Sequence, residues 1–189
     1  MSKEHTQDTL QAKTLQVKEL LQAYGVPVEQ FGTGKAKTLE HLAQEILEGE
    51  TVLVDIDGKI VRRVELVHID VRFTKDGVEL QLVEDRQVFT DGRERRRGLT
   101  GISEKMKPGE NPSLSAKRAL AEEIGVVVMT DVQSIGTEEE TRTSPSYPGL
   151  STEYLRHEMA TTISEADFRE DGYVEVQPDK TTYFVWRSI

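Results

Sequence analysis

The sequence of 189 residues contains no cysteine, which excludes disulfide bonds, thiolate metal sites and cysteine nucleophiles. It has no apolar run approaching the ~20 residues that a membrane-spanning helix needs. The N-terminal residues Met-Ser-Lys-Glu-His-Thr-Gln-Asp lack the apolar core of a signal peptide, so we expect a cytoplasmic protein. Positive charge is also scarce: the net charge is −10, which argues against broad binding to nucleic acids or anionic membranes. An anionic substrate would therefore need local basic residues or a bridging cation.

The spacing of apolar residues changes along the chain near residue 50. Before it, helices are predicted over 14–24 and 38–47, preceded by a polar segment at 1–13 that we expect to be frayed. After it, alternating β-branched residues and the turn signals Asp57-Gly58 and Asp76-Gly77 predict strands. We also expect strand material over 126–129. The prediction is a helical N-terminal extension over 1–50 and an α/β domain over 51–189.

Residues 103–126 are predicted to form a loop that leads into a helix. Asn111 is a good N-cap, Pro112 suits the first helical position and Gly125 suits the left-handed residue past the end. Glu122 and Glu123 project from the side away from Leu120, and Glu110 lies just before the N-cap. Carboxylates gathered beside a turn with exposed amides suit hard divalent cations such as Mg²⁺, which prefer oxygen ligands. The alternative is that Glu122 and Glu123 are a solvated helix face.

This stretch resembles the Nudix box, which reads Gly, five residues, Glu, seven residues, then Arg-Glu-U-x-Glu-Glu-x-Gly-U, with U a bulky aliphatic residue. The matching positions are Glu110, Arg118, Leu120, Glu122, Glu123, Gly125 and Val126. Glu104 stands where the family has its first glycine, and Ala119 stands where it has the first glutamate of the Arg-Glu pair. That glutamate usually contributes to metal binding in the family.

The resemblance implies a fold, a cofactor and site residues. The implied fold is a Nudix-like α/β/α sandwich with a mixed, twisted sheet, here with a helical N-terminal extension. The cofactor would be Mg²⁺ or Mn²⁺ held by Glu110, Glu122 and Glu123, with Glu122 and Glu123 also catalytic. The segment 147–153 resembles part of the ADP-ribose-type Nudix pyrophosphatases, which makes Glu153 a further catalytic candidate.

Four arginines between Arg93 and Arg97 are the densest positive charge in this acidic chain. Guanidinium groups form bidentate contacts with phosphate, so Arg95, Arg96 and Arg97 are candidate substrate-binding residues. The alternative is a solvated loop with local salt bridges.

Two functions are compatible with these observations. The first is a divalent-metal-dependent hydrolase of a nucleoside diphosphate linked to another moiety, with a small nucleotide-type molecule as its partner. The second is a Nudix-fold nucleotide-binding or regulatory module that has lost turnover, and Ala119 is its main support. The sequence also allows a homo-oligomer.

Overall fold

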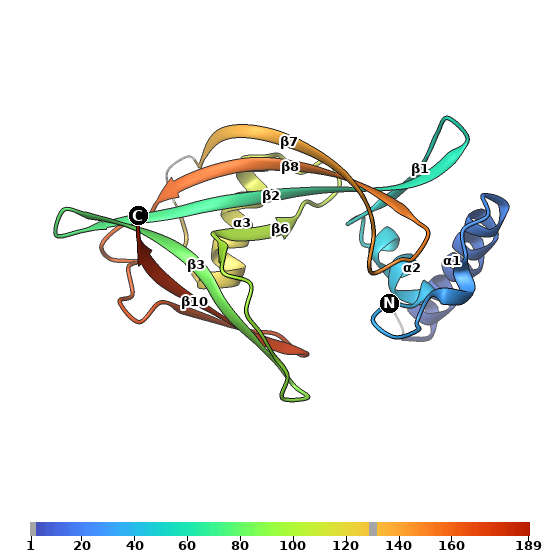
Figure 1. Cartoon of the computed structure of the whole chain (residues 1–189), viewed down its shortest axis with the longest axis horizontal. Coiled ribbons are helices and arrows are strands. Elements are labelled where there is room, and N and C mark those ends of the chain that lie inside the picture. Colours follow the sequence, from blue (N-terminus) through green and yellow to red (C-terminus); the bar gives the residue numbers. More distant parts are fainter. Residues whose placement is uncertain (1–2, 129–131) are drawn as a thin grey trace. The chain divides into compact units, whose positions relative to one another are not determined.

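The computed structural model describes residues 3–128 and 132–189 of the chain (Figure 1). The chain forms two compact units, Met1–Glu65 with Glu138–Leu155, and Leu66–Thr137 with Arg156–Ile189. The strands that contribute residues to both units are β2 (Lys59–Lys75), β7 (Gln133–Thr143) and β8 (Ser151–Thr162). The predicted division near residue 50 into separate domains stays a prediction. None of the described helices is long and apolar enough to cross a membrane.

The first unit contains α1 (Lys3–Ala23), the 3₁₀ turn η1 (Val28–Gln30), α2 (Leu39–Leu47) and β1 (Val52–Ile56). The Thr38 side chain caps α2 by accepting a hydrogen bond from the amide of His41, as expected of an N-cap threonine. The helices and the strands share one apolar core, formed by Val17, Leu21, Val26, Leu42, Ile60, Tyr147 and Leu150. The predicted α2 is confirmed, and the N-terminal helices are packed elements of this unit.

Helix α1 is longer than the sequence indicated. Residues 3–13, expected to be frayed, are helical, and residues 1–2 lie outside the described part. Polar side chains support this stretch: the Thr14 hydroxyl donates to the carbonyl of Leu10 at 2.8 Å, and Lys13 donates to Gln16 at 2.8 Å. Apolar periodicity reports which residues are packed, so a solvated part of a helix carries no such signal.

The two predicted hairpin turns are confirmed. Asp57 and Gly58 have φ values of 51° and 75°, and Asp76 and Gly77 have φ values of 51° and 80°. Positive φ at both central residues matches the twist of the flanking strands, which is why Asp-Gly suits such hairpins. These turns fix the register of β1 with β2 and of β2 with β3.

The sheet has the strand order β7-β8-β2-β3-β10-β9. Its remaining members are β3 (Val78–Phe89), β4 (Glu94–Arg95), β5 (Leu99–Thr100), β6 (Ile102–Lys105), β9 (Tyr173–Val176) and β10 (Lys180–Ser188). Strand β3 is antiparallel to β2 and to β10. Strands β2 and β8 run in the same direction, because Arg63 is paired with Glu153 and the amide of Ile163 donates to the carbonyl of Arg72. The predicted mixed sheet is therefore confirmed.

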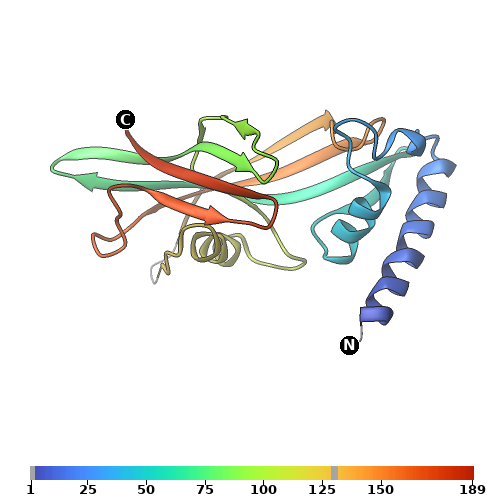
Figure 2. The same cartoon turned by 90° about the horizontal axis from the view of Figure 1, so that it is seen from below.

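Helix α3 (Pro112–Ile124) lies against one face of the strands of the second unit, as Figure 2 shows. Asn111 caps it by accepting from the amide of Ser113 at 2.8 Å, and Gly125 ends it with φ 69°. Its apolar side packs with β2, β3, β6, β8, β9 and β10 through Ala116, Ala119, Leu120 and Ile124. The helix boundaries inferred from the sequence are confirmed.

The segment after α3 differs from its prediction. Residues 126–128, expected to be a strand, form no regular element, and Met129 lies outside the described residues. The amide of Val126 donates to the carbonyl of Leu120, and the Val126 side chain is buried in the core. An apolar run that covers a helix end has the same composition as a buried strand, so the sequence could not separate the two.

Candidate functional site

The Arg118 guanidinium on α3 forms hydrogen bonds with most of the carboxylates in the Nudix-like stretch. It donates to Glu110 through Nε at 2.9 Å and Nη2 at 3.0 Å. Its Nη1 reaches Glu122 at 2.9 Å and Glu104 at 3.3 Å. It also donates to the carbonyl of Lys105 at 3.0 Å, which ties the helix to β6. We call Arg118 with Glu104, Glu110 and Glu122 the arginine cluster.

Electrostatics within the arginine cluster favour the ionised forms of Glu110 and Arg118. The hydrogen bond from Arg118, supported by the amide of Lys107, lowers the pKa of Glu110 to about 2 despite the opposing effect of burial. The same carboxylates raise the pKa of Arg118, with the hydrogen bond to Glu110 as the largest cause. Glu110 and Glu122, both predicted metal ligands, thus share the single positive charge of Arg118 with Glu104.

Glu123 lies outside this arrangement and faces another carboxylate. Burial, the hydrogen bond to Glu175 on β9, and repulsion from Glu175 and Glu104 raise the pKa of Glu123 to about 8, while Lys180 opposes the shift. A carboxyl group with this pKa carries its proton at neutral pH and can donate it to the neighbouring carboxylate. We call Glu123 and Glu175 the carboxyl pair.

Strand geometry places Glu175 toward α3. Alternate residues of a strand share one face, and Tyr173, two positions earlier, is buried in the core beneath α3. Glu175 was not among the residues selected from the sequence. The alternation of residues in Tyr-Val-Glu-Val could have indicated this position. It places the glutamate on the same face of the strand as the aromatic Tyr173.

Ala119 is fully buried among the apolar residues below α3, with 0% of its surface exposed. In the family this position carries a glutamate, and here a methyl group fills the space against the sheet. Glu175 enters the same helix face from β9 instead, and meets Glu123 there.

A divalent cation is compatible with the donor set of the carboxyl pair. Within residues 3–128 and 132–189, no cluster of three or more His, Asp or Glu side chains is arranged as a metal-binding group. Mg²⁺, however, keeps several water ligands and commonly uses one or two carboxylates together with substrate phosphates. The carboxyl pair supplies two carboxyl groups, and their mutual repulsion favours the binding of a cation. In the arginine cluster a metal ion would have to compete with Arg118, which is hydrogen-bonded to Glu104, Glu110 and Glu122.

The three predicted substrate-binding arginines have different environments. Arg97 forms a two-pronged ion pair with Glu84, and Arg96 pairs with Asp85 at 3.0 Å and Glu94 at 2.6 Å. Arg95 is exposed on β4, and within the described part of the chain it makes no ion pair. Their role in substrate binding stays a prediction, for which Arg95 is the most available of the three.

Glu153, the further catalytic candidate, belongs to the first unit. Arg63 donates to its carboxylate through Nε at 3.1 Å and Nη2 at 2.9 Å. The two side chains line a hollow of about 110 Å³ together with Glu139, Glu140, Thr141, Tyr154 and Leu155. The carboxyl pair belongs to the second unit, so a catalytic contribution of Glu153 stays a prediction.

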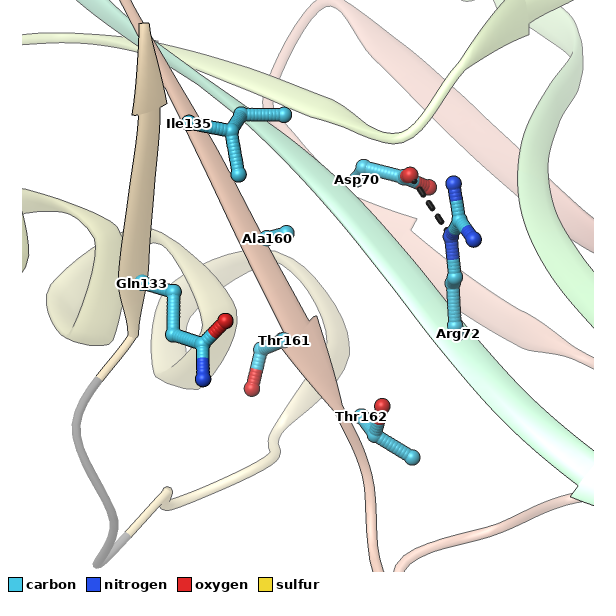
Figure 3. Close-up of a pocket in the computed structure, with 7 residues that line it drawn as sticks. All are labelled: Asp70, Arg72, Gln133, Ile135, Ala160, Thr161 and Thr162. Carbon is cyan, nitrogen blue, oxygen red and sulfur yellow. Dashed lines mark hydrogen bonds and ion pairs between the residues drawn. The ribbon is translucent and has the colours of Figure 1, made fainter.

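The second unit also has a hollow of about 470 Å³, shown in Figure 3, that does not include the carboxyl pair. Its charged residues Asp70 and Arg72 alternate along β2 with the core residues Ile69 and Val71, and therefore point to the face away from α3. Asp70 accepts from Arg72 and from Gln81, both at 2.8 Å. Its charge is thus satisfied within the protein, and the hollow offers no group suited to metal-assisted chemistry.

No family model matches this sequence, and no curated protein sequence matches it either. Solved structures do match. A C. elegans Ap4A hydrolase aligns with 66% of this chain and 79% of its own, at 13% identity and a TM-score of 0.37. The NUDIX domain of Shewanella oneidensis NrtR, solved with ADP ribose, aligns with 67% of this chain and 73% of its own, at 13% identity and a TM-score of 0.42.

A MutT/nudix family protein from Enterococcus faecalis aligns with 81% of this chain at 14% identity and a TM-score of 0.48. The chain spans about half of that protein's length, since 51% of it is covered. The second and third of these proteins are described as Nudix proteins. All three are below 25% identity and below 0.5 in TM-score.

Proposed function

We propose that the protein is a divalent-metal-dependent hydrolase of Nudix type, which cuts a nucleoside diphosphate linked to another moiety. The observation that carries this proposal is the carboxyl pair. Two carboxyl groups face each other in a partly buried site, and the pKa of Glu123 is raised to about 8. A bound cation would relieve the repulsion between them. The other box carboxylates differ because each of them forms an ion pair with Arg118.

The residues of the second unit have separate tasks in this reaction. When bound, Mg²⁺ or Mn²⁺ would polarise the phosphate oxygens and lower the pKa of a coordinated water. Glu123 and Glu175 would hold the cation, and whichever carboxylate oxygen remains free would accept the proton of the attacking water.

The arginine cluster positions this site and takes no part in the chemistry. Arg118 fixes the loop before α3 by binding Glu110, and fixes β6 by binding Glu104 and the carbonyl of Lys105. Because these contacts hold the middle of α3 against the preceding loop and β6, Glu123 would keep a constant position relative to β9. Rigid support of this kind is what lets two carboxylates and a cation reach a productive geometry.

A second candidate is the binding or regulatory module without turnover. It is favoured by the buried Ala119, which replaces a family carboxylate by a packed methyl group, and by the engagement of Glu110 and Glu122 with Arg118. In that case the carboxyl pair would bind a metal–nucleotide complex and release it unchanged.

One experiment separates the two functions. The protein is assayed with Mg²⁺ or Mn²⁺ on ADP-ribose and other nucleoside diphosphate derivatives, alongside Glu175→Gln and the exposed loop control Glu165→Gln. The hydrolase predicts metal-dependent cleavage that Glu165→Gln retains and Glu175→Gln loses by ~10²–10⁴. Metal-dependent nucleotide binding without cleavage would establish the binding module. Cleavage that Glu175→Gln leaves intact would contradict the proposed site.

A further inference from the structure

We propose that Lys180 binds a phosphate group of the substrate beside the carboxyl pair. This inference rests on the proposed function for the position of the cation, and it adds the residue that recognises the anion bound with that cation. The ligand class is a pyrophosphate or a diphosphate ester in complex with a divalent cation. Lys180 is the first residue of β10 and belongs, like Glu123 and Glu175, to the second unit.

Strand register places the Lys180 side chain on the face that carries the carboxyl pair. Glu175 on β9 is paired with Thr182 on β10. Directly paired residues of antiparallel strands point to the same face, and so does every second residue of one strand. Lys180, two positions before Thr182, is therefore a diagonal neighbour of Glu175 on that face. Diagonal neighbours lie ~7–8 Å apart, a separation that a long side chain can span.

The ammonium group of Lys180 has no fixed partner in the part of the chain that the structure describes. Its side chain forms neither an ion pair nor a hydrogen bond there. Glu175 instead accepts a hydrogen bond from the side chain of Gln177, whose backbone amide donates to the carbonyl of Lys180. The positive charge of Lys180 nevertheless opposes the rise in the pKa of Glu123, so it acts within electrostatic range of the carboxyl pair. Lys180 is thus close to the site and available to a ligand.

A ligand can reach these side chains from solvent. Glu123, Glu175 and Lys180 are all partly exposed. Strand β9 is the last strand in the order of the sheet, so Glu175 lies at a sheet edge. Mg²⁺ keeps several of its water ligands when it binds to proteins, and a solvated position of this kind suits it. The ligand would therefore bind at an open edge and would not need an enclosed cavity.

The balance of charge favours a phosphate as the ligand. Two ionised carboxylates and one divalent cation balance each other, so the ammonium group leaves one positive charge that an anionic ligand can offset. Mg²⁺ is commonly held by one or two carboxylates together with substrate phosphates, and lysine binds phosphate as a point charge. Arg118 differs from Lys180 because it is hydrogen-bonded to three carboxylates. Lys180 is therefore the better candidate for a contact with phosphate.

The test measures metal binding and phosphate binding separately in the full-length protein. Mn²⁺ alone, and inorganic pyrophosphate in the presence of Mn²⁺, are titrated calorimetrically into the wild type, Lys180→Met and Lys180→Arg. Methionine keeps most of the aliphatic stem and removes the charge, whereas arginine keeps the charge. The control Lys18→Met removes the same charge from an exposed position of α1 in the first unit. Lys180→Gln is a second neutral variant for the case that Lys180→Met does not fold.

The two titrations should change in opposite directions. Lys180→Met should bind pyrophosphate ~10-fold more weakly, because a charge-assisted contact is lost. It should bind Mn²⁺ alone more tightly, because a positive charge near the cation has been removed. Lys180→Arg should retain pyrophosphate binding, and Lys18→Met should match the wild type in both titrations. A residue with a merely structural role would weaken both kinds of binding when it is replaced.

Unchanged or tighter binding of pyrophosphate by Lys180→Met would overturn the inference and leave Lys180 as a counter-ion of the carboxyl pair. Weaker binding of both ligands, an equal loss in Lys18→Met, or no pyrophosphate binding by the wild type would overturn it as well. The hydrolase assay is independent. Pyrophosphate binding that depends on Lys180, without hydrolysis of any nucleoside diphosphate derivative, would sustain the phosphate contact and reject the proposed function. Hydrolysis that depends on Glu175, with unchanged pyrophosphate binding by Lys180→Met, would do the reverse.

Discussion

The carboxylates of helix α3 fall into two groups that differ in charge balance, although neighbouring residues of the chain supply them. In the arginine cluster one guanidinium serves Glu104, Glu110 and Glu122, and the pKa of Glu110 falls to about 2. In the carboxyl pair Glu123 faces Glu175, and its pKa rises to about 8. Glu122 and Glu123 are adjacent in sequence and yet belong to opposite groups.

This difference shows how to separate structural from functional acidic residues. A carboxylate that already has a cation gains little from a metal, because the attraction would have to compete with the existing ion pair. A carboxylate held beside a second one has a charge that a proton or a metal can balance, and here Lys180 opposes the repulsion only in part. We therefore propose that the arginine cluster supports the helix and that the carboxyl pair carries the chemistry.

The largest effect should come from removing one member of the carboxyl pair. Glu123→Gln keeps the shape of the side chain but cannot balance a cation, so metal-dependent turnover should fall by ~10²–10⁴. The matched variant Glu122→Gln changes the next residue, which is 56% exposed and paired with Arg118, and should cost far less. Steady-state rates on the substrate found in the screen measure both. Equal losses in the two variants would remove the distinction between the groups.

The next effect concerns Ala119, which the family resemblance marks as a missing carboxylate. The side chain is fully buried in the core, so Ala119→Glu should destabilise the fold by ~3 kcal/mol, through overpacking and an unpaired buried charge. Ala121→Glu is the matched control, because Ala121 is exposed on the same helix. Chemical denaturation gives both free energies of unfolding. A stable Ala119→Glu variant with increased turnover would show instead that the position opens into the site.

A smaller effect is expected from Arg118→Met, which leaves the partly buried Glu110 without its cation. The free energy of unfolding should fall by ~2 kcal/mol at neutral pH. Because the folded-state pKa of Glu110 lies below its ordinary 4.5, its stabilising contribution is complete above about 4.5 and is lost as the pH falls toward 2. Arg118→Met should flatten that acid limb of a stability–pH profile. An unchanged limb would show that Glu110 does not depend on Arg118.

Local features were predictable from the sequence because local residues determine them. Asn111, Pro112 and Gly125 defined α3, and the Asp-Gly pairs defined the hairpin turns. The register of Glu110, Arg118 and Glu123 also placed the candidate site on α3, and the role of that site stays a prediction. These signals depend on backbone preferences that act over a few residues.

Partners distant in the sequence could not be predicted in the same way. Glu175 meets Glu123 only because β9 pairs with β10 and faces α3. Arg118 binds Glu122 and not Glu123 because the two glutamate side chains leave the helix in different directions. The part of α1 before Thr14 was missed because its sequence is polar and has no apolar periodicity.

Proton release on metal binding tests most directly whether the carboxyl pair is the cation site. Since the pKa of Glu123 is about 8, the group is protonated at pH 7 and must lose its proton before it can bind a metal ion. Calorimetric titration with Mn²⁺ in buffers of different ionisation enthalpy should show release of about one proton at pH 7, declining toward zero above pH 9, and no release from Glu123→Gln. Metal binding without proton release, or the same release from Glu123→Gln, would contradict the account.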